Sequence, residues 1–351
     1  MNIGIFIPNW IGDAAMCTPT LRALRRHYGA DTRMVGIMRP YVAEVLAGTR
    51  LLDGQIAYHT KSKTPSERIW GVLKEMKKQK FDVAVMLTNS FRSAMLAWSA
   101  GIPTRVGYVR YGRGPLLTHK LYEPQLRRKR LPFPAIDAYL QLAYALGCEV
   151  ESPRLELATQ PAEEAAADAV WKKLKLPMGH QVVVLNSGGA FGAAKLWPNE
   201  HFAELARRLV TEQGLAVLVA CGPAEREVAR TIVRLADHPR VVSLADEPVS
   251  IGLTKACIRR SRLLITTDSG PRFFAVAFNV PVISLFGPTD AAWTRTHYDH
   301  ETCLSHSVPC GPCSQRVCPL KHHECMRHLS VHRVYAAALE QLVIQRESRA
   351  A

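Results

Sequence analysis

Apolar residues occur along this chain in short continuous runs that alternate with amphipathic stretches. The runs at 3–8, 81–87 and 263–266 have the length of buried strands. Between such runs the apolar residues follow helical spacing, for example over 14–28 and 199–212. Strands that alternate with helices predict an α/β fold with parallel sheets covered on both faces.

This alternation occurs twice along the chain. Residues 151–161 lack periodicity and predict a linker, after which a new strand and a glycine-rich loop begin. A length of 351 residues also favours two domains. The sequence therefore predicts domains at 1–158 and 159–330, followed by a C-terminal helix at 331–351.

Composition and charge narrow the possible partners. The chain is 48% apolar and 21% charged, which is ordinary for a globular protein, and its net charge of +15 favours an anionic partner. Nucleic acid, nucleotide phosphates and an acidic membrane surface all fit. The segment 101–130 has eight Lys or Arg residues against one acid, and its glycines and prolines predict irregular structure.

Nothing in the chain predicts a membrane-spanning helix, because no apolar run approaches the roughly 20 residues that one needs. The start lacks a basic region before its apolar residues and soon reaches Asp13, which predicts a first strand rather than a signal peptide. We therefore expect a cytoplasmic protein that could dock on a membrane face.

A polar turn follows the predicted strand at 263–266. It consists of Asp268, Ser269 and Gly270, and Pro271 suits the first position of the next helix. A helix N-terminus offers free N–H groups and the positive end of a dipole, which suits a phosphate. A βαβ turn without a ligand is the alternative.

Other polar residues follow further strands of the second half. Ser187 and Gly188 begin a glycine-rich loop that includes Lys195, and Glu225 follows another strand. Lys195 is either a phosphate ligand or a solvated lysine, and Glu225 either binds ribose or begins a helix. Because the carboxyl ends of parallel strands meet at one edge, the set predicts a nucleotide site.

Asp13 lies after the first strand, at the corresponding edge of the first half. A carboxylate there can act as a general base if it reaches a substrate hydroxyl. It can also cap the helix that we expect to begin at Ala14. Two such edges that face each other across a cleft would provide a nucleotide site and an acceptor site.

Five of the nine cysteines lie between Cys303 and Cys325. Four of them have the spacing C-x2-C-x4-C-x6-C, with two histidines inside. These residue types suit tetrahedral zinc, although the spacing is not that of a common zinc finger. Free thiols or a structural loop are the alternatives in a reducing compartment. The candidate zinc ligands are Cys310, Cys313, Cys318 and Cys325.

Taken together and in this order, the motifs resemble those of the bacterial lipopolysaccharide heptosyltransferases, glycosyltransferase family 9, and most closely the heptosyltransferase II branch. The resemblance covers nearly the whole chain. The motifs are Asn9-Trp-Ile-Gly-Asp13, Thr18-Pro-Thr-Leu-Arg22, Asn89-Ser-Phe-Arg-Ser-Ala94, Gly101-Ile-Pro-Thr-Arg-Val-Gly107, Gly192-Ala-Ala-Lys-Leu-Trp-Pro198, Asp268-Ser-Gly-Pro271, Leu285-Phe-Gly-Pro-Thr289 and the block from Cys310 to Cys325.

The resemblance implies a GT-B fold, in which two Rossmann-like β/α/β domains face each other across a cleft. It implies inverting transfer of heptose from ADP-L-glycero-D-manno-heptose to a heptosyl residue of the lipid A–core acceptor. No metal would take part in catalysis, and a zinc ion at the cysteine block would be structural. The protein would work at the inner face of the cytoplasmic membrane without nucleic acid, and a monomer is favoured.

The resemblance also implies roles for single residues. Asp13 would be the general base, and Asp268 would orient its turn or contact the donor. The other donor ligands would be Ser187, Gly188, Lys195, Glu225, Ser269 and Gly270, with Glu225 on the ribose, and the acceptor ligands would be Asn89 and Arg92.

Two positions depart from the family pattern. Phe273 stands where the family usually has histidine, so either a phosphate contact is lost or Arg272 supplies it. Asp246 stands where the family usually has glycine. The alternative function is therefore a related family 9 transferase with another nucleotide sugar or acceptor. A more remote alternative is a basic, zinc-containing nucleic-acid-binding protein.

Overall fold

A computed structural model describes residues 1–127, 129–178, 181–189 and 192–350. The chain divides into two compact units, Met1–Ala158 with Ala292–His297 and Thr159–Ala291 with Tyr298–Ala351. Residues 292–297 thus group with the first unit, and the C-terminal helix groups with the second rather than standing apart.

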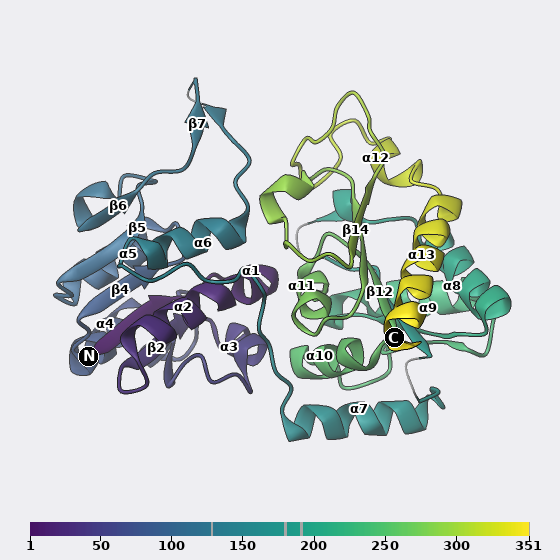
Figure 1. The fold of residues 1–351 in the computed structure, drawn as a ribbon, viewed down its shortest axis with the longest axis horizontal. Coiled ribbons are helices and arrows are strands. Elements are labelled where there is room, and N and C mark those ends of the chain that lie inside the picture. Colours follow the sequence, from purple (N-terminus) through teal and green to yellow (C-terminus); the bar gives the residue numbers. More distant parts are fainter. Residues whose placement is uncertain (128, 179–180, 190–191, 351) are drawn as a thin grey trace. The chain divides into compact units, whose positions relative to one another are not determined.

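The first unit contains a parallel six-stranded sheet with helices packed on it (Figure 1). The strand order is β3-β2-β1-β4-β5-β6. Strands β2 and β3 are therefore added on one side of β1, and β4 to β6 on the other. We call the boundary between β1 and β4 the reversal point of the sheet. Ile3 and Ile5 of the central β1 are fully buried, as expected for a parallel sheet covered on both faces. The strands are β1 (Asn2–Phe6), β2 (Arg33–Met38), β3 (Gly54–Ala57), β4 (Val83–Met86), β5 (Thr104–Tyr108) and β6 (His119–Leu121).

The helices of the first unit bury apolar faces and expose charged ones. In α2, for example, Leu21 and Leu24 are fully buried, whereas Arg26 is exposed. The helices are α1 (Ile11–Met16), α2 (Thr18–Tyr28), α3 (Pro40–Leu46), α4 (Ile69–Gln79), α5 (Phe91–Ser99) and α6 (Ala135–Tyr144), with short 3-10 turns η1 (Pro65–Glu67) and η2 (Gly114–Leu116).

The single helix that we expected over 14–28 is two helices. It breaks at Cys17, because Pro19 lacks an N–H and suits only the first turn of a helix. The first helix begins at Ile11, with Trp10 as its N-cap, so Asp13 lies inside the first turn. The alternative that Asp13 caps the helix is therefore wrong. Its carboxylate instead lies near the positive end of the α1 dipole.

The basic segment 101–130 is more regular than its glycines and prolines suggested. It contains β6, which completes the edge of the sheet parallel to β5, and both strands of a small antiparallel hairpin, β7 (Gln125–Leu126) and β8 (Lys129–Arg130). Edge strand β6 is mostly exposed and polar. It therefore lacks the apolar run by which the buried strands are recognised.

The second unit contains another parallel six-stranded sheet, ordered β11-β10-β9-β12-β13-β14. The order is the same as in the first sheet, with the reversal point between β9 and β12. The half-exposed edge strand β14 gave no apolar run and was not expected. The strands are β9 (Val182–Asn186), β10 (Ala216–Ala220), β11 (Val241–Ser243), β12 (Leu263–Thr267), β13 (Val282–Phe286) and β14 (Glu301–Ser305).

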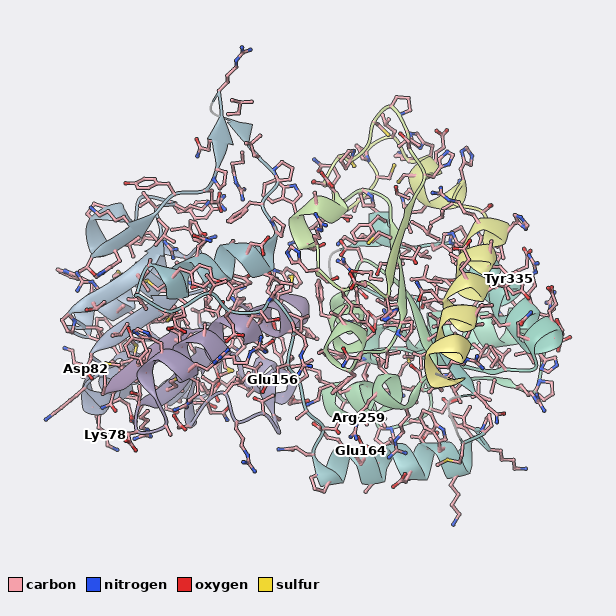
Figure 2. The ribbon with its side chains drawn as sticks, in the orientation of Figure 1. Lys78, Asp82, Glu156, Glu164, Arg259 and Tyr335 are labelled. Carbon is pink, nitrogen blue, oxygen red and sulfur yellow. The ribbon has the colours of Figure 1, made fainter. Side chains whose placement is uncertain are left out.

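Ion pairs join two helices of the second unit. Glu164 of α7 accepts from Arg259 of α10 at 2.8 Å and from Arg260 at 2.6 Å (Figure 2). The helices are α7 (Pro161–Lys173), α8 (Asn199–Gln213), α9 (Arg226–Ala236), α10 (Ile251–Arg260), α11 (Gly270–Ala277), α12 (Glu324–Arg327) and α13 (Val331–Ala350), and the 3-10 turns are η3 (Ala193–Lys195), η4 (Pro223–Glu225) and η5 (Ala291–Thr294).

These sheets confirm the predicted α/β class. In an open parallel sheet, the loops on either side of a reversal diverge and leave a crevice at the carboxyl ends of the strands. The reversal lies between β1 and β4 in the first unit and between β9 and β12 in the second. Within the described residues, no helix combines the length and apolar character needed to span a bilayer.

Candidate active site

An ion pair occupies the reversal point of the second sheet. Lys195 Nζ lies 2.5 Å from Asp268 Oδ2 and 3.1 Å from the Asp268 carbonyl oxygen, although the two residues are 73 positions apart. Both side chains are less than 10% exposed. Thr289 Oγ1 donates to the same carboxylate oxygen at 2.8 Å. The fold thus joins the glycine-rich loop after β9 to the turn after β12.

Asn186, the last residue of β9, links the same two loops. Its amide nitrogen lies 2.9 Å from Ser269 Oγ, 3.0 Å from Thr266 Oγ1 and 3.2 Å from the Gly188 carbonyl oxygen. Thr267 Oγ1 also donates to that carbonyl, at 3.2 Å. The motifs in the sequence do not identify Asn186, although an amide at the end of an otherwise apolar strand is a signal for it.

Arg272 lies on the first turn of α11, directly behind Asp268. Its side chain is fully buried, its guanidinium binds both oxygens of Glu301, and its Nη1 lies 3.7 Å from Asp268 Oδ1. Burial works to lower the pKa of Arg272, but the charge and hydrogen bond of Glu301 outweigh it and raise that pKa. The hypothesis that Arg272 replaces the family histidine as a phosphate ligand is therefore not supported. Its buried guanidinium holds Asp268 and Glu301 in place.

The N-terminus of α11 lies next to this cluster. Ser269 is the N-cap, the helix begins at Gly270, and Pro271 follows as the second helical residue rather than the first. The Ser269 hydroxyl bonds Asn186 and Thr266 instead of capping the helix. The N–H groups of the first turn consequently remain available to an anion.

Glu225 and the start of the glycine-rich loop are in contact. A Cβ atom on Gly188 would lie 2.8 Å from Glu225 Cδ, so only glycine fits there without displacing the glutamate. Glu225 Oε2 accepts from the Gly222 N–H at 2.8 Å, as expected for a glutamate in a first helical turn. Ser187 Oγ is buried and has no hydrogen-bond partner among the residues that the structure describes.

In the first unit, Asp13 forms a hydrogen bond that the sequence did not reveal. Tyr139 of α6 donates its hydroxyl to Asp13 Oδ1 at 2.9 Å. Burial raises the pKa of Tyr139 well above its usual value, and the neighbouring charge of Asp13 raises it further. The phenol therefore stays protonated and serves as a fixed donor to the carboxylate. The spacing of apolar residues over 135–146 indicates only that Tyr139 lies in a helix.

Asn89 follows β4, the strand next to β1, and its orientation is fixed by Arg113. Arg113 is fully buried and donates from Nη2 to Asn89 Oδ1 at 2.9 Å and from Nε to the Tyr108 carbonyl at 2.7 Å. Burial lowers the pKa of Arg113 to about 10, so it remains charged at neutral pH. Arg92, on α5, is exposed. Asp13 and Asn89 thus follow the two strands that border the first reversal point.

The four candidate zinc ligands line one cavity together with His322 and His323. Cys310 Sγ lies 3.8 Å from His322 Nε2. Backbone N–H hydrogen bonds, chiefly that of His323, hold the pKa of the Cys318 thiol below its usual value and favour a thiolate. Across the described part of the chain, however, no group of three or more His, Cys, Asp or Glu residues is arranged to hold a metal ion. The zinc site stays a prediction.

Comparison with known proteins agrees with this architecture. The sequence model of glycosyltransferase family 9 (heptosyltransferase) matches residues 69–324. A lipooligosaccharide heptosyltransferase 2 of Campylobacter jejuni is 25% identical over 336 residues, which cover 95% of this chain and 97% of that protein.

Solved structures share the fold. Escherichia coli ADP-heptose lipopolysaccharide heptosyltransferase II superposes with a TM-score of 0.79 at 21% identity, over 99% of this chain and 100% of that one. An E. coli heptosyltransferase solved with ADP superposes with a TM-score of 0.73 at 15% identity, over 97% and 100% of the two chains.

Two Rossmann-like units, each with polar residues gathered at the reversal point of its sheet, form the architecture of the GT-B fold. More specifically, the family match covers well over half of the chain. The chain belongs to glycosyltransferase family 9, the heptosyltransferases, as its motifs predicted.

Proposed function

We propose that this enzyme transfers heptose from ADP-L-glycero-D-manno-heptose to a heptosyl residue of the lipopolysaccharide inner core, with inversion at the anomeric carbon. The observation that carries the proposal is the buried Lys195–Asp268 pair beside the N-terminus of α11 in a family 9 chain. Relatives named as heptosyltransferases of lipopolysaccharide or lipooligosaccharide, and a related fold solved with ADP, support the donor and the acceptor class.

On the donor side, we assign the diphosphate to Lys195 and to the N–H groups of Ser269 and Gly270. When the bond between the anomeric carbon and ADP breaks, its electron pair leaves on a phosphate oxygen. A fixed ammonium and a helix N-terminus stabilise that charge where it develops. Asp268 orients Lys195, and the positive charge of Arg272 near Asp268 Oδ1 offsets the negative charge of that carboxylate. Because these groups supply positive charge, the proposed mechanism needs no catalytic metal.

The remaining donor contacts follow from the loops that border the reversal point. We place Ser187 and Gly188 alongside the donor. Because Gly188 has no side chain, Glu225 fits next to it. Carboxylates accept hydrogen bonds from hydroxyl groups, so we assign Glu225 to the ribose. The hydrogen bond to the Gly222 N–H would hold its second oxygen during this contact.

On the acceptor side, we assign Asp13 as the general base. It removes the proton of the acceptor hydroxyl, whose oxygen attacks the anomeric carbon as ADP leaves from the opposite side. Tyr139 holds the carboxylate in one orientation. Asn89, fixed by Arg113, and the exposed Arg92 would bind the acceptor and its phosphates. Since that acceptor is anchored in a membrane, the enzyme would work at the cytoplasmic membrane face.

The test is a transfer assay on purified protein with ADP-heptose and a water-soluble heptosylated acceptor, with the product identified by mass spectrometry. Asp13→Asn should lower the transfer rate by at least about a hundredfold while ADP still binds in calorimetry. Asp31→Asn, which changes an exposed aspartate of the same unit, is the matched control. Full turnover by Asp13→Asn would exclude Asp13 as the base.

One observation favours a second candidate, a family 9 transferase that uses another nucleotide sugar. Phe273 stands at the usual histidine position and is only 3% exposed, with its ring centre 5.0 Å from the Arg272 guanidinium carbon. A phenylalanine cannot bind phosphate, so the contacts to the donor differ at this point. A panel of nucleotide sugars compared by transfer rate would show whether ADP-heptose is the preferred donor.

A further inference from the structure

The hairpin formed by β7 and β8 stands out from the sheet of the first unit (Figure 1). Three large apolar side chains on and beside it are exposed, namely Tyr122 at 71%, Leu126 at 62% and Leu131 at 41%. Burying such side chains would stabilise this fold, yet the hairpin leaves them in water. Grouped exposed apolar residues of this kind mark a surface that binds a partner.

Strand register places the leucines on one face of the hairpin. Leu126 pairs with position 129 and Gln125 with Arg130, and the Leu131 N–H donates to the Pro124 carbonyl at 3.0 Å. Directly paired residues share a face, and residues two apart along a strand share one as well. Leu126 and Leu131 therefore lie on one face, and Gln125 and Arg130 on the other.

The other face is held by the protein itself. Arg130 Nε lies 2.6 Å from Glu123 Oε2, and its guanidinium carbon lies 4.9 Å from the ring centre of Trp293. Arg110 binds the same glutamate at 3.1 Å. These contacts fix the orientation of the hairpin and neutralise Glu123. The face that carries the leucines is thus the one presented outward.

Charge identifies the partner. Residues 119–131 contain five Lys or Arg residues and Glu123 as the single acid, and the side chains of Lys120 and Arg127 are exposed. Each basic residue near an anionic leaflet gains about 1 kcal/mol, and tyrosine is enriched at the level of the headgroups. Leucine gains from the acyl boundary but not from a hydrated phosphate backbone or oligosaccharide.

We infer that the β7–β8 hairpin docks the enzyme on an anionic phospholipid bilayer, an inference that rests on the proposed membrane-anchored acceptor. Leu126 and Leu131 enter the boundary between headgroups and acyl chains. Lys120 and Arg127 meet the phosphates of the headgroups. Docking of this kind concentrates the enzyme where its acceptor is anchored.

The experiment is sedimentation of the full-length protein with vesicles of phosphatidylcholine alone or with one-third phosphatidylglycerol. Wild type should bind the phosphatidylglycerol vesicles at least about tenfold more tightly than the neutral ones, and 0.5 M NaCl should weaken that binding. The double variant Leu126→Glu/Arg127→Glu should bind them at least about tenfold more weakly.

The matched control is Val150→Glu/Lys78→Glu, which likewise replaces one apolar and one basic residue with glutamate at exposed positions of the same unit (Figure 2 labels Lys78). It should bind within about twofold of wild type. Equal binding to neutral vesicles, no binding by wild type, or equal losses in both double variants would overturn the inference.

Transfer to the water-soluble acceptor separates this inference from the proposed function. The hairpin variant should transfer heptose to that acceptor at the wild-type rate and lose rate only with acceptor embedded in vesicles. Loss with the soluble acceptor as well would mean that the hairpin binds the oligosaccharide rather than the bilayer. Absence of transfer by wild type would refute the proposed function but leave the vesicle result standing.

Discussion

The buried pair of Arg272 and Glu301 offers the sharpest test of how the donor side is built. The two side chains are 0% and 4% exposed, and Asp268 lies within 3.7 Å of the same guanidinium. Arg272→Met removes the positive charge and leaves two nearby carboxylates to repel each other. Breaking one side of a buried pair costs about 3–5 kcal/mol, a large part of the roughly 5–15 kcal/mol that stabilises a typical domain.

The assay is a double-mutant cycle measured by urea unfolding, with hydrogen exchange to locate the loss in the second unit. Arg272→Met and Glu301→Gln should each lower the free energy of unfolding by about 3 kcal/mol or more. In the double variant, the loss of unfolding free energy should be at least about 2 kcal/mol smaller than the sum of the losses in the two single variants, because no uncompensated charge remains between those two positions. Arg230→Met, which breaks a solvent-exposed pair with Asp246 in the same unit, should leave the urea midpoint unchanged.

Additive losses of unfolding free energy in the cycle, or an unchanged urea midpoint in Arg272→Met, would refute the coupling between Arg272 and Glu301. ADP affinity provides a second measurement. Arg272 lies 3.7 Å from Asp268 Oδ1, through which it would act on the proposed diphosphate site, so the variant that stays folded should bind ADP more weakly. Equal ADP binding in a destabilised Arg272→Met protein would show that the pair supports the fold alone.

Three further predictions concern the other residues of the site. Lys195→Ala should lower the transfer rate by about 10²–10³ and weaken ADP binding, and a change confined to the acceptor KM would contradict its assignment to the diphosphate. Tyr139→Phe removes a donor that favours the charged form of Asp13, so the acid limb of the pH–rate profile should move to higher pH, and an unmoved limb would show that Tyr139 does not tune the base. If the cysteine block holds zinc, elemental analysis of protein purified under reducing conditions should give about one zinc per chain, and this content should fall sharply in Cys318→Ser. A wild-type protein without metal would mean that the block is a structural loop with free thiols.

The buried elements can be located from the order of residues alone. Central strands such as β1, β4, β9 and β12 lie between other strands and under helices, so their residues are apolar except for polar ones at the strand ends, and each run is visible in the sequence. Because all these strands run parallel, their carboxyl ends share an edge. Position along the chain alone therefore placed Asp13, Lys195 and Asp268 at the correct ends of strands.

Tertiary structure decided what the sequence left open. Edge strands β3, β6 and β14 are partly exposed, so they need no apolar run and were not expected. Strand order depends on pairing between distant segments, and that order brings Lys195 against Asp268.

The same reason explains the supporting residues that were missed. Tyr139 lies 126 positions from Asp13, and Glu301 lies 29 from Arg272. A hydrogen bond or ion pair between residues so far apart leaves no period or spacing in the sequence. The chemistry-bearing residues could be found from local pattern because they sit where strands end. Their partners could not, because only the packing of α6 on α1 and of β14 beside β13 brings them within bonding distance.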